Sequence, residues 1–250
     1  MKRIPTLYIL FLIPFSIISS CHSSYQSQSL QYKSYSISIA GTEDSLVSAL
    51  LIPYSDSVNR SMNKVIGIAE KTLEKKKPEG TLGNFMANAF LVMAEEKYNT
   101  NVDAAFMNDG GIRLDQLTAG PVTKGKIFEL MPFDNVLILQ KIKGEVLQQF
   151  LDLIAGQGGW PVAGLMMQIR NKKAVNVVIG GKPLDPEATY TTANSDFIAN
   201  GGGNADMLRP IQQISNGYLV RDALFDYIKK RKEDGKNIDA NLENRVTNVQ

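Results

Sequence analysis

Helical and strand-like hydrophobic spacings mix irregularly along this chain from residue 45 onward, and that mixture constrains the fold more than any other feature. Apolar residues recur at intervals of three and four in stretches that begin at Leu82, Val146 and Val220. This spacing is typical of helices with one buried face. We expect Thr81 to be the N-cap of the first helix and Gly156 to end the second. A further helix is expected over residues 45–62.

Shorter runs between these helices predict strands. The expected strands are 65–69, 103–107, 136–142, 166–170, 175–179 and 190–193, with a turn at Gly180-Gly181. Helices and strands do not alternate strictly. The sequence therefore predicts an α+β fold, a mixed β-sheet flanked by helices, rather than a doubly wound parallel sheet.

Cys21 is the only cysteine, so the fold has no internal disulfide and must rely on its hydrophobic core. This cysteine ends an Ile-Ser-Ser-Cys segment after a basic start and an apolar run, which resembles a bacterial lipobox. We expect residues 1–20 to be a lipoprotein signal peptide, 21–44 a Ser/Gln-rich tether and 45–250 the folded domain. The protein is then exported and lipid-anchored to the cell envelope. An ordinary secretory signal is the alternative.

The charge balance and the histidine content argue against a nucleic-acid partner and against a metal site. The chain has 27 Lys and Arg and 25 Asp and Glu; without Lys2 and Arg3 of the leader, both counts are 25 (27 minus 2). Nucleic-acid binding needs many basic contacts to phosphate, so we expect no nucleic-acid partner. His22 is the only histidine, and it adjoins the predicted lipidation site. We therefore expect no metal site and no catalytic residue in this chain.

Residues 108–113, Asn-Asp-Gly-Gly-Ile-Arg, follow a predicted strand and carry groups suited to binding an anion. The two glycines let backbone N–H groups approach a ligand closely. Arg113 can grip a phosphate bidentately, and such bonds are worth about 1.5–3 kcal/mol. Taken alone, the segment is also an ordinary turn with an arginine on the surface.

Two phenylalanines lie at strand ends. Phe133 belongs to Pro132-Phe-Asp-Asn135, which precedes a predicted strand, and Phe197 follows another and precedes three glycines. Two rings that face each other would clamp a base, and stacking is worth about 1–3 kcal/mol per base. Each ring, considered alone, is equally well explained as part of the core.

In this order and spacing the segments resemble the C-terminal domain of the bacterial 5′-nucleotidase family, which includes UDP-sugar hydrolases and 2′,3′-cyclic phosphodiesterases. The resemblance covers about residues 45–246. It also rests on Glu-Gly-Thr-Leu-Gly-Asn at 79–84, Lys-Gly-Glu-Val-Leu at 143–147 and Gly-Lys-Pro-Leu-Asp-Pro at 181–186.

The resemblance implies roles for particular residues. Arg113 would contact phosphate and Asn108 the nucleoside, while Phe133 and Phe197 would sandwich the base. It also implies that Asn135 and Gly158, the latter just before Trp160-Pro161, lie beside the base pocket.

The sequence departs from the family pattern at two places. The family's Gly-Gly-Asp aspartate, which holds the ribose hydroxyls, corresponds to Gly203, so Asn204 or Asp206 would have to replace it. A second phosphate-binding arginine of the family corresponds to Pro78, with lysines at 75–77 nearby. Lysine supplies charge but no bidentate fork.

In that family a separate N-terminal metallophosphatase domain holds two metals. The resemblance therefore implies that this chain is the nucleotide-recognition half of a split 5′-nucleotidase in nucleotide catabolism. It would bind a nucleotide or nucleoside, hold no cofactor and be inactive alone, while a separate metallophosphatase polypeptide supplies divalent metals. The carboxylates near the predicted pocket are expected in turn and surface roles: Asp103, Asp109, Asp115 and Asp134.

Two alternatives stand beside this interpretation. One is a non-catalytic nucleoside-binding or structural surface lipoprotein. The other rests on Ser61-Met-Asn-Lys64, which spells the Ser-x-x-Lys of penicillin-recognising serine enzymes. No Lys-Thr-Gly strand accompanies it in the sequence.

Overall fold

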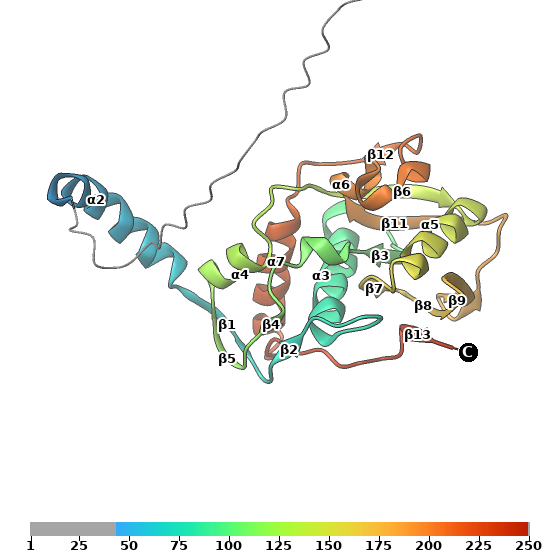
Figure 1. Cartoon of the computed structure of the whole chain (residues 1–250), viewed down its shortest axis with the longest axis horizontal. Helices are drawn as coiled ribbons and strands as arrows, with labels where there is room; N and C mark the ends of the chain where they lie inside the picture. The colour runs from blue at the N-terminus through green and yellow to red at the C-terminus, as the bar shows by residue number, and fades with distance from the viewer. Residues whose placement is uncertain (1–43, 250) are drawn as a thin grey trace, which may run out of the picture. The chain divides into compact units, whose positions relative to one another are not determined.

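A computed structural model describes residues 44–249 of the chain (Figure 1). The predicted signal peptide, Cys21, His22 and nearly all of the predicted tether lie outside the described residues. The helices are α2 (Ser45–Met62), α3 (Thr81–Tyr98), α4 (Lys124–Leu130), α5 (Gly144–Gly156), α6 (Asp196–Ala199) and α7 (Val220–Glu233). Three short 3₁₀ helices are η1 (Asp109–Gly111), η2 (Gly202–Asn204) and η3 (Asp206–Leu208). The strands are β1 (Val65–Ala69), β2 (Leu73–Glu74), β3 (Ala104–Phe106), β4 (Gln116–Leu117), β5 (Gly120–Thr123), β6 (Leu137–Lys143), β7 (Val162–Ala163), β8 (Leu165–Arg170), β9 (Lys173–Ile179), β10 (Lys182–Pro183), β11 (Thr189–Ser195), β12 (Gln213–Ile214) and β13 (Val246–Asn248).

The predicted helices and strands all occur, but the start of α3 differs in detail. Gly80, not Thr81, is the N-cap, and the Thr81 hydroxyl instead accepts a hydrogen bond from Glu74 N at 2.9 Å. A Cβ atom at position 80 would lie 2.4 Å from Lys76 N. The backbone at residue 76 therefore passes too close to position 80 for any residue but glycine. The Thr81 hydroxyl instead links β2 to α3 through its hydrogen bond with Glu74.

The central sheet has five strands in the order β12-β6-β11-β3-β7. Strands β6 and β11 are antiparallel along seven residue pairs, from Thr189 opposite Lys143 to Ser195 opposite Leu137. Strand β3 runs parallel to β11, whereas β7 is antiparallel to β3 and β12 antiparallel to β6. The sheet is mixed, which confirms the predicted fold class.

The other strands form smaller sheets. Strands β10-β9-β8-β13 make a four-stranded sheet, and β1-β5 and β2-β4 pair separately. Gly180 and Gly181 have φ angles of +56° and +78° and join β9 to β10, as the sequence predicted.

Two hydrophobic clusters lie on opposite sides of the central sheet. Strand β3 shows the division, since Ala105 belongs to one cluster while Ala104 and Phe106 belong to the other. Alternation along a strand sends neighbouring side chains to opposite faces. Helices α3 and α7 supply much of the first cluster, and α5 packs with β8 and β9 in the second (Figure 1).

Two of the sequence motifs quoted above pack against each other where α5 begins. Gly144 opens α5, and a Cβ atom there would lie 2.0 Å from the carbonyl oxygen of Asp185. Glu145 N donates to Pro186 O at 3.0 Å in the same contact. The motifs at 143–147 and 181–186 therefore pack against each other and have a structural role.

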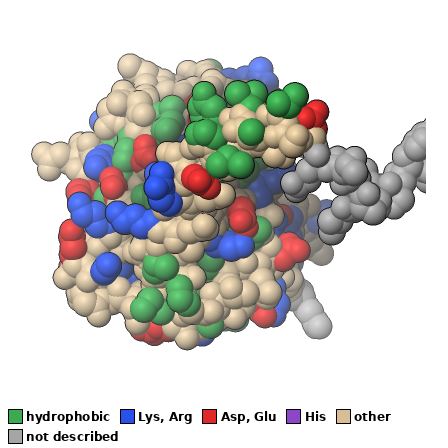
Figure 2. Space-filling view, turned by 90° about the vertical axis from the view of Figure 1, so that its left-hand side faces the viewer, with side chains coloured by type: hydrophobic (Ala, Val, Ile, Leu, Met, Phe, Trp, Pro, Cys, Tyr) green, Lys and Arg blue, Asp and Glu red, His purple; other side chains and the backbone are tan. Residues whose placement is uncertain are grey.

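Charges of both signs interleave over the face drawn in Figure 2, in keeping with the nearly equal numbers of acidic and basic residues. Within residues 44–249, no helix has the length and apolar character needed to cross a membrane.

Candidate functional site

Three chain segments that carry predicted site residues meet at one edge of the central sheet. Asn108 follows the carboxyl end of β3, and Phe197 follows the carboxyl end of β11. Phe133 precedes the amino end of β6. Because β3 is parallel to β11 while β6 is antiparallel to it, all three residues emerge at the same edge.

A pocket of about 640 Å³ lies at this edge. Phe133 and Phe197 both line it, and they keep 39% and 46% of their surfaces exposed. Neither ring is sunk in the core, and both border the same pocket. The full lining is Asn108, Gly110, Gly111, Pro132, Phe133, Asp134, Asn135 and Phe197.

The segment after β3 forms η1 and turns tightly under the pocket. A Cβ atom at Gly111 would lie 3.0 Å from Asn108 Oδ1, so a small residue is required there. Asp109 directs its carboxylate toward Lys75 Nζ at 3.5 Å and Lys77 Nζ at 3.8 Å. Two of the lysines predicted to supply positive charge therefore anchor this segment.

Arg113 is exposed and is not part of the pocket lining, but it lies close by. Its guanidinium carbon is 5.8 Å from the centre of the Phe133 ring, and Nη1 donates to Gly110 O at 3.4 Å. A cation beside an aromatic ring is weakly attracted to it. The arrangement places an exposed positive charge next to one wall of the pocket.

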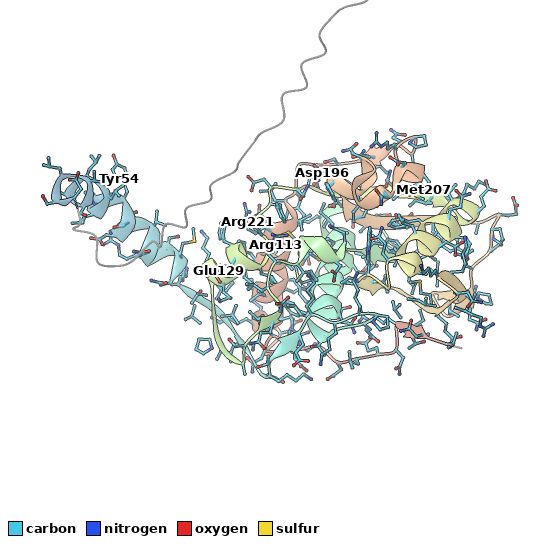
Figure 3. All side chains as sticks on the ribbon, in the orientation of Figure 1. Tyr54, Arg113, Glu129, Asp196, Met207 and Arg221 are labelled. Atoms are coloured by element: carbon cyan, nitrogen blue, oxygen red, sulfur yellow. The ribbon has the colours of Figure 1, made fainter. Side chains whose placement is uncertain are left out.

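Arg221 holds the Phe133 loop; it is 9% exposed and lies in the first turn of α7 (Figure 3). Its Nη1 donates to the carbonyl of Phe133 at 3.2 Å, and Nη2 donates to Asp134 Oδ1 at 2.5 Å. The guanidinium also lies 4.3 Å from the centre of the Phe128 ring. Sequence reasoning missed Arg221, because its distance along the chain from Phe133 gives no signal.

Asp196 holds the same loop from the other side. Its Oδ1 accepts hydrogen bonds from Asn135 Nδ2 at 3.0 Å, Val136 N at 3.1 Å and Phe197 N at 2.8 Å. Asp196 begins α6, and Ser195 caps that helix by accepting from Ile198 N at 3.3 Å. One carboxylate therefore links the segments that carry the two rings.

Gly158, predicted to lie beside the base pocket, is not part of the pocket lining. It precedes β7, and a Cβ atom there would contact only the Lys77 side chain, at 3.7 Å. In the strand order, β7 lies beyond β3 from β11. Because β7 is antiparallel to β3, its amino end lies at the same edge of the sheet as Asn108, and Met107 N donates to Pro161 O there at 3.1 Å.

The region predicted to replace the ribose-binding aspartate also lies outside the pocket lining. A Cβ atom at Gly203 would come within 2.9 Å of the Trp160 ring, which is buried in the second cluster. Asp206 pairs with Arg209 at 2.9 Å, and Asn204 is exposed. Trp160 therefore occupies the space that a side chain at position 203 would need.

The acidic residues near the pocket have structural partners. Asp103 Oδ2 accepts from Thr191 N at 2.7 Å, while Asp109 and Asp134 pair with the cations described above. Among residues 44–249, no group of three or more His, Cys, Asp or Glu side chains is placed to hold a metal ion. Ser61 and Lys64 are both exposed, at the end of α2 and just after it.

Comparison with known proteins agrees with this geometry. A family model described as 5′-nucleotidase, C-terminal domain, matches residues 61–210. Protein UshA of Yersinia enterocolitica is 27% identical over 194 residues, which make up 75% of this chain and 35% of UshA. The 5′-nucleotidase of Vibrio cholerae is 28% identical over 198 residues, with 75% and 34% covered.

Among solved structures, a 5′-nucleotidase precursor from Thermus thermophilus matches with a TM-score of 0.70 and 28% identity, over 83% of this chain and 44% of that one. The chain thus belongs to the 5′-nucleotidase C-terminal domain family. It spans about a third of the length of the two relatives compared by sequence.

Proposed function

We propose that the pocket between Phe133 and Phe197 binds the base of a nucleotide, with its phosphate toward Arg113. The observation that carries this proposal is the pair of exposed rings lining one pocket of about 640 Å³. Single exposed apolar side chains are common, but two aromatic rings that border one pocket are typical of the apolar lining of a ligand site. Membership of the 5′-nucleotidase C-terminal domain family supports the same assignment.

Binding of adenosine to the full chain, measured by calorimetry, tests the proposal. The variant Phe197→Ala should weaken binding by about 5- to 150-fold, since stacking is worth about 1–3 kcal/mol per base. Tyr54→Ala is a matched control, because Tyr54 is an exposed aromatic residue on α2, outside the pocket lining. Equal affinities for wild type and Phe197→Ala would overturn the assignment.

We also propose that phosphate-ester hydrolysis takes place on a metallophosphatase unit carried by a separate polypeptide. That unit would hold the divalent metals and activate water, while this chain would orient the nucleotide. The proposal is supported by the share of the relatives that this chain matches, about a third of their length. Relatives named 5′-nucleotidases thus contain much more than the part that this chain resembles.

Phosphate release from AMP by each polypeptide alone and by the mixture tests this division. Candidates for the companion are metallophosphatases exported from the same cell. The mixture should release more phosphate than the sum of the two, and Phe197→Ala should abolish the gain. If no mixture releases phosphate faster than the sum of the two separate rates, the split-enzyme proposal is wrong.

A binding-only lipoprotein is the second candidate function, and one observation favours it. Trp160 fills the space beside Gly203, so no carboxylate holds ribose hydroxyls at that position. Adenosine binding without partner-dependent turnover would support this alternative.

We propose that Cys21 carries the lipid anchor of an exported protein, on the strength of the lipobox-like sequence. Cys21→Ala should lose both labelling by radioactive palmitate and recovery in the membrane fraction. Palmitate labelling that persists in the variant would contradict the anchor.

A further inference from the structure

The carboxylate of Asp196 accepts hydrogen bonds from both of the segments that carry the pocket rings. Three N–H groups converge on a single oxygen, Oδ1: the side-chain amide of Asn135 and the backbone amides of Val136 and Phe197. The three distances fall between 2.8 and 3.1 Å. Figure 3 shows Asp196 at the start of α6.

This arrangement determines which way the Asn135 amide faces. Backbone N–H groups can only donate, so two of them make Asp196 Oδ1 an acceptor. Asn135 must therefore turn its Nδ2 toward Asp196. Its carbonyl oxygen then lies on the other branch of the planar amide, and Asn135 is part of the pocket lining.

We propose that Asp196 is a positioning residue that fixes Asn135 with its carbonyl oxygen toward the ligand, so that the pocket selects bases carrying an amino group. This inference rests on the proposed nucleotide site. An amino group on the base donates to the Asn135 oxygen, whereas a base without one leaves that oxygen unpaired. Sites built to hydrogen-bond a substrate group discriminate well against analogues that lack it.

Adenosine and purine riboside differ only in the amino group, and their dissociation constants measured by calorimetry on the full chain test base selection. Purine riboside should bind about tenfold more weakly, the expected effect of one unpaired acceptor. Asn135→Ala should bring the ratio of the two constants close to one, because the acceptor is gone while both rings remain.

Variants of Asp196 test the positioning role. Asp196→Ala removes the acceptor, so the Asn135 amide is free to rotate and the ratio should fall toward one. Asp196→Asn keeps an oxygen for the two backbone donors and should retain the wild-type ratio. Asp196→Ser, whose hydroxyl both donates and accepts, should lower the ratio and replaces the alanine variant if that does not fold. Asp185→Ala is a matched control, because Asp185 also accepts a backbone N–H bond, from Glu187, outside the pocket.

The outcomes separate this inference from the function on which it rests. Failure of both nucleosides to bind wild type would overturn the proposed function itself. Equal binding of the two by wild type would overturn base selection and leave the proposed function standing. A tenfold ratio that survives in both Asp196→Ala and Asp196→Ser would overturn the positioning role. A ratio that falls in those variants and persists in Asp196→Asn supports the whole inference.

Discussion

Arg113 and Arg221 show how differently two arginines act around one pocket. Arg221 is almost fully buried and directs its donors to the carbonyls and carboxylate of the Phe133 loop. Arg113 is exposed, and its guanidinium donates to the Gly110 carbonyl and lies over the Phe133 ring. The first arginine therefore shapes the site, and the second is placed to meet a ligand.

Arg113→Ala should separate nucleotide binding from nucleoside binding. Loss of a bidentate phosphate contact is expected to weaken AMP by about 10- to 150-fold, corresponding to about 1.5–3 kcal/mol, and to leave adenosine within about twofold of wild type. Calorimetry with both ligands measures the difference. Arg170→Ala, on the exposed end of β8, is the control. Parallel losses for AMP and adenosine would show that Arg113 does not contact phosphate.

Arg221→Ala should destabilise the fold far more than Asp134→Ala does. The side chain of Asp134 is 78% exposed, so its ion pair with Arg221 is worth about 0–1 kcal/mol. Arg221 also satisfies loop carbonyls and packs on Phe128, so its removal should lower the free energy of unfolding by about 2–4 kcal/mol. Urea unfolding of both variants gives the comparison. Equal losses would mean that the ion pair dominates.

The family resemblance, and not residue identity alone, led us to expect Asn108 and the two rings at the site, but it did not indicate the groups that position them. Asn108, Phe133 and Phe197 belong to short local motifs at strand ends, and such motifs can be seen in the sequence. Arg221 is brought to the loop by tertiary packing, and no local pattern in the sequence marks that contact. The place of Gly158 beside the base stays a prediction, since Gly158 lies outside the pocket lining.

At the scale of elements, long periodic segments were predictable and short ones were not. Helices α3, α5 and α7 have apolar stripes that match their buried residues. Strands β2 and β4 have two residues each, and α6 has four, so none carries a periodic signal. Their conformations depend on partners elsewhere in the fold, such as the Asp196 hydrogen bonds at α6.

The pairing of α3 with α7 should make stability depend on acid. Burial opposes ionisation of Asp226 in α7, but hydrogen bonds from Lys97 at 3.0 Å and the Tyr218 hydroxyl at 2.8 Å outweigh it, so its pKa lies below the ordinary 3.8. Burial and the Asp226 carboxylate in turn raise the pKa of Tyr218, which keeps its hydroxyl a donor.

A carboxyl group whose pKa is lowered on folding stabilises the protein above its unfolded pKa and loses that contribution as pH falls through the folded value. Wild type should therefore lose stability below about pH 4, and Asp226→Asn should lose less over the same interval. Urea midpoints at pH 7 and pH 3 measure the two losses. An identical loss in the variant would show that Asp226 is not a source of the acid sensitivity.

At the scale of the whole domain, the two hydrophobic clusters share the central sheet and should unfold together. Trp160, the single tryptophan, is buried in the second cluster and packs against Phe150 at 5.8 Å between ring centres. Helices α3 and α7 belong to the first cluster and contribute much of the helical signal. Tryptophan fluorescence therefore reports on the second cluster alone, whereas far-UV circular dichroism includes the helices of the first.

Urea transitions followed by these two probes should coincide, as expected for a cooperative unit. Phe150→Ala should shift both by the same amount and lower the free energy of unfolding by about 3–5 kcal/mol, a typical cost of removing a buried aromatic ring. A fluorescence transition at lower urea than the circular dichroism transition would show that the clusters unfold separately.

Strand register has a further consequence for recognition. Ser195 is paired with Leu137, so a ladder of backbone hydrogen bonds fixes the two strand ends from which the segments of Phe133 and Phe197 extend. Strand ends that are already fixed need no ordering when a ligand binds, and this lowers the entropic cost of binding. The thickness and planarity of a ligand then decide first whether it fits the pocket, before the particular chemical groups that it carries.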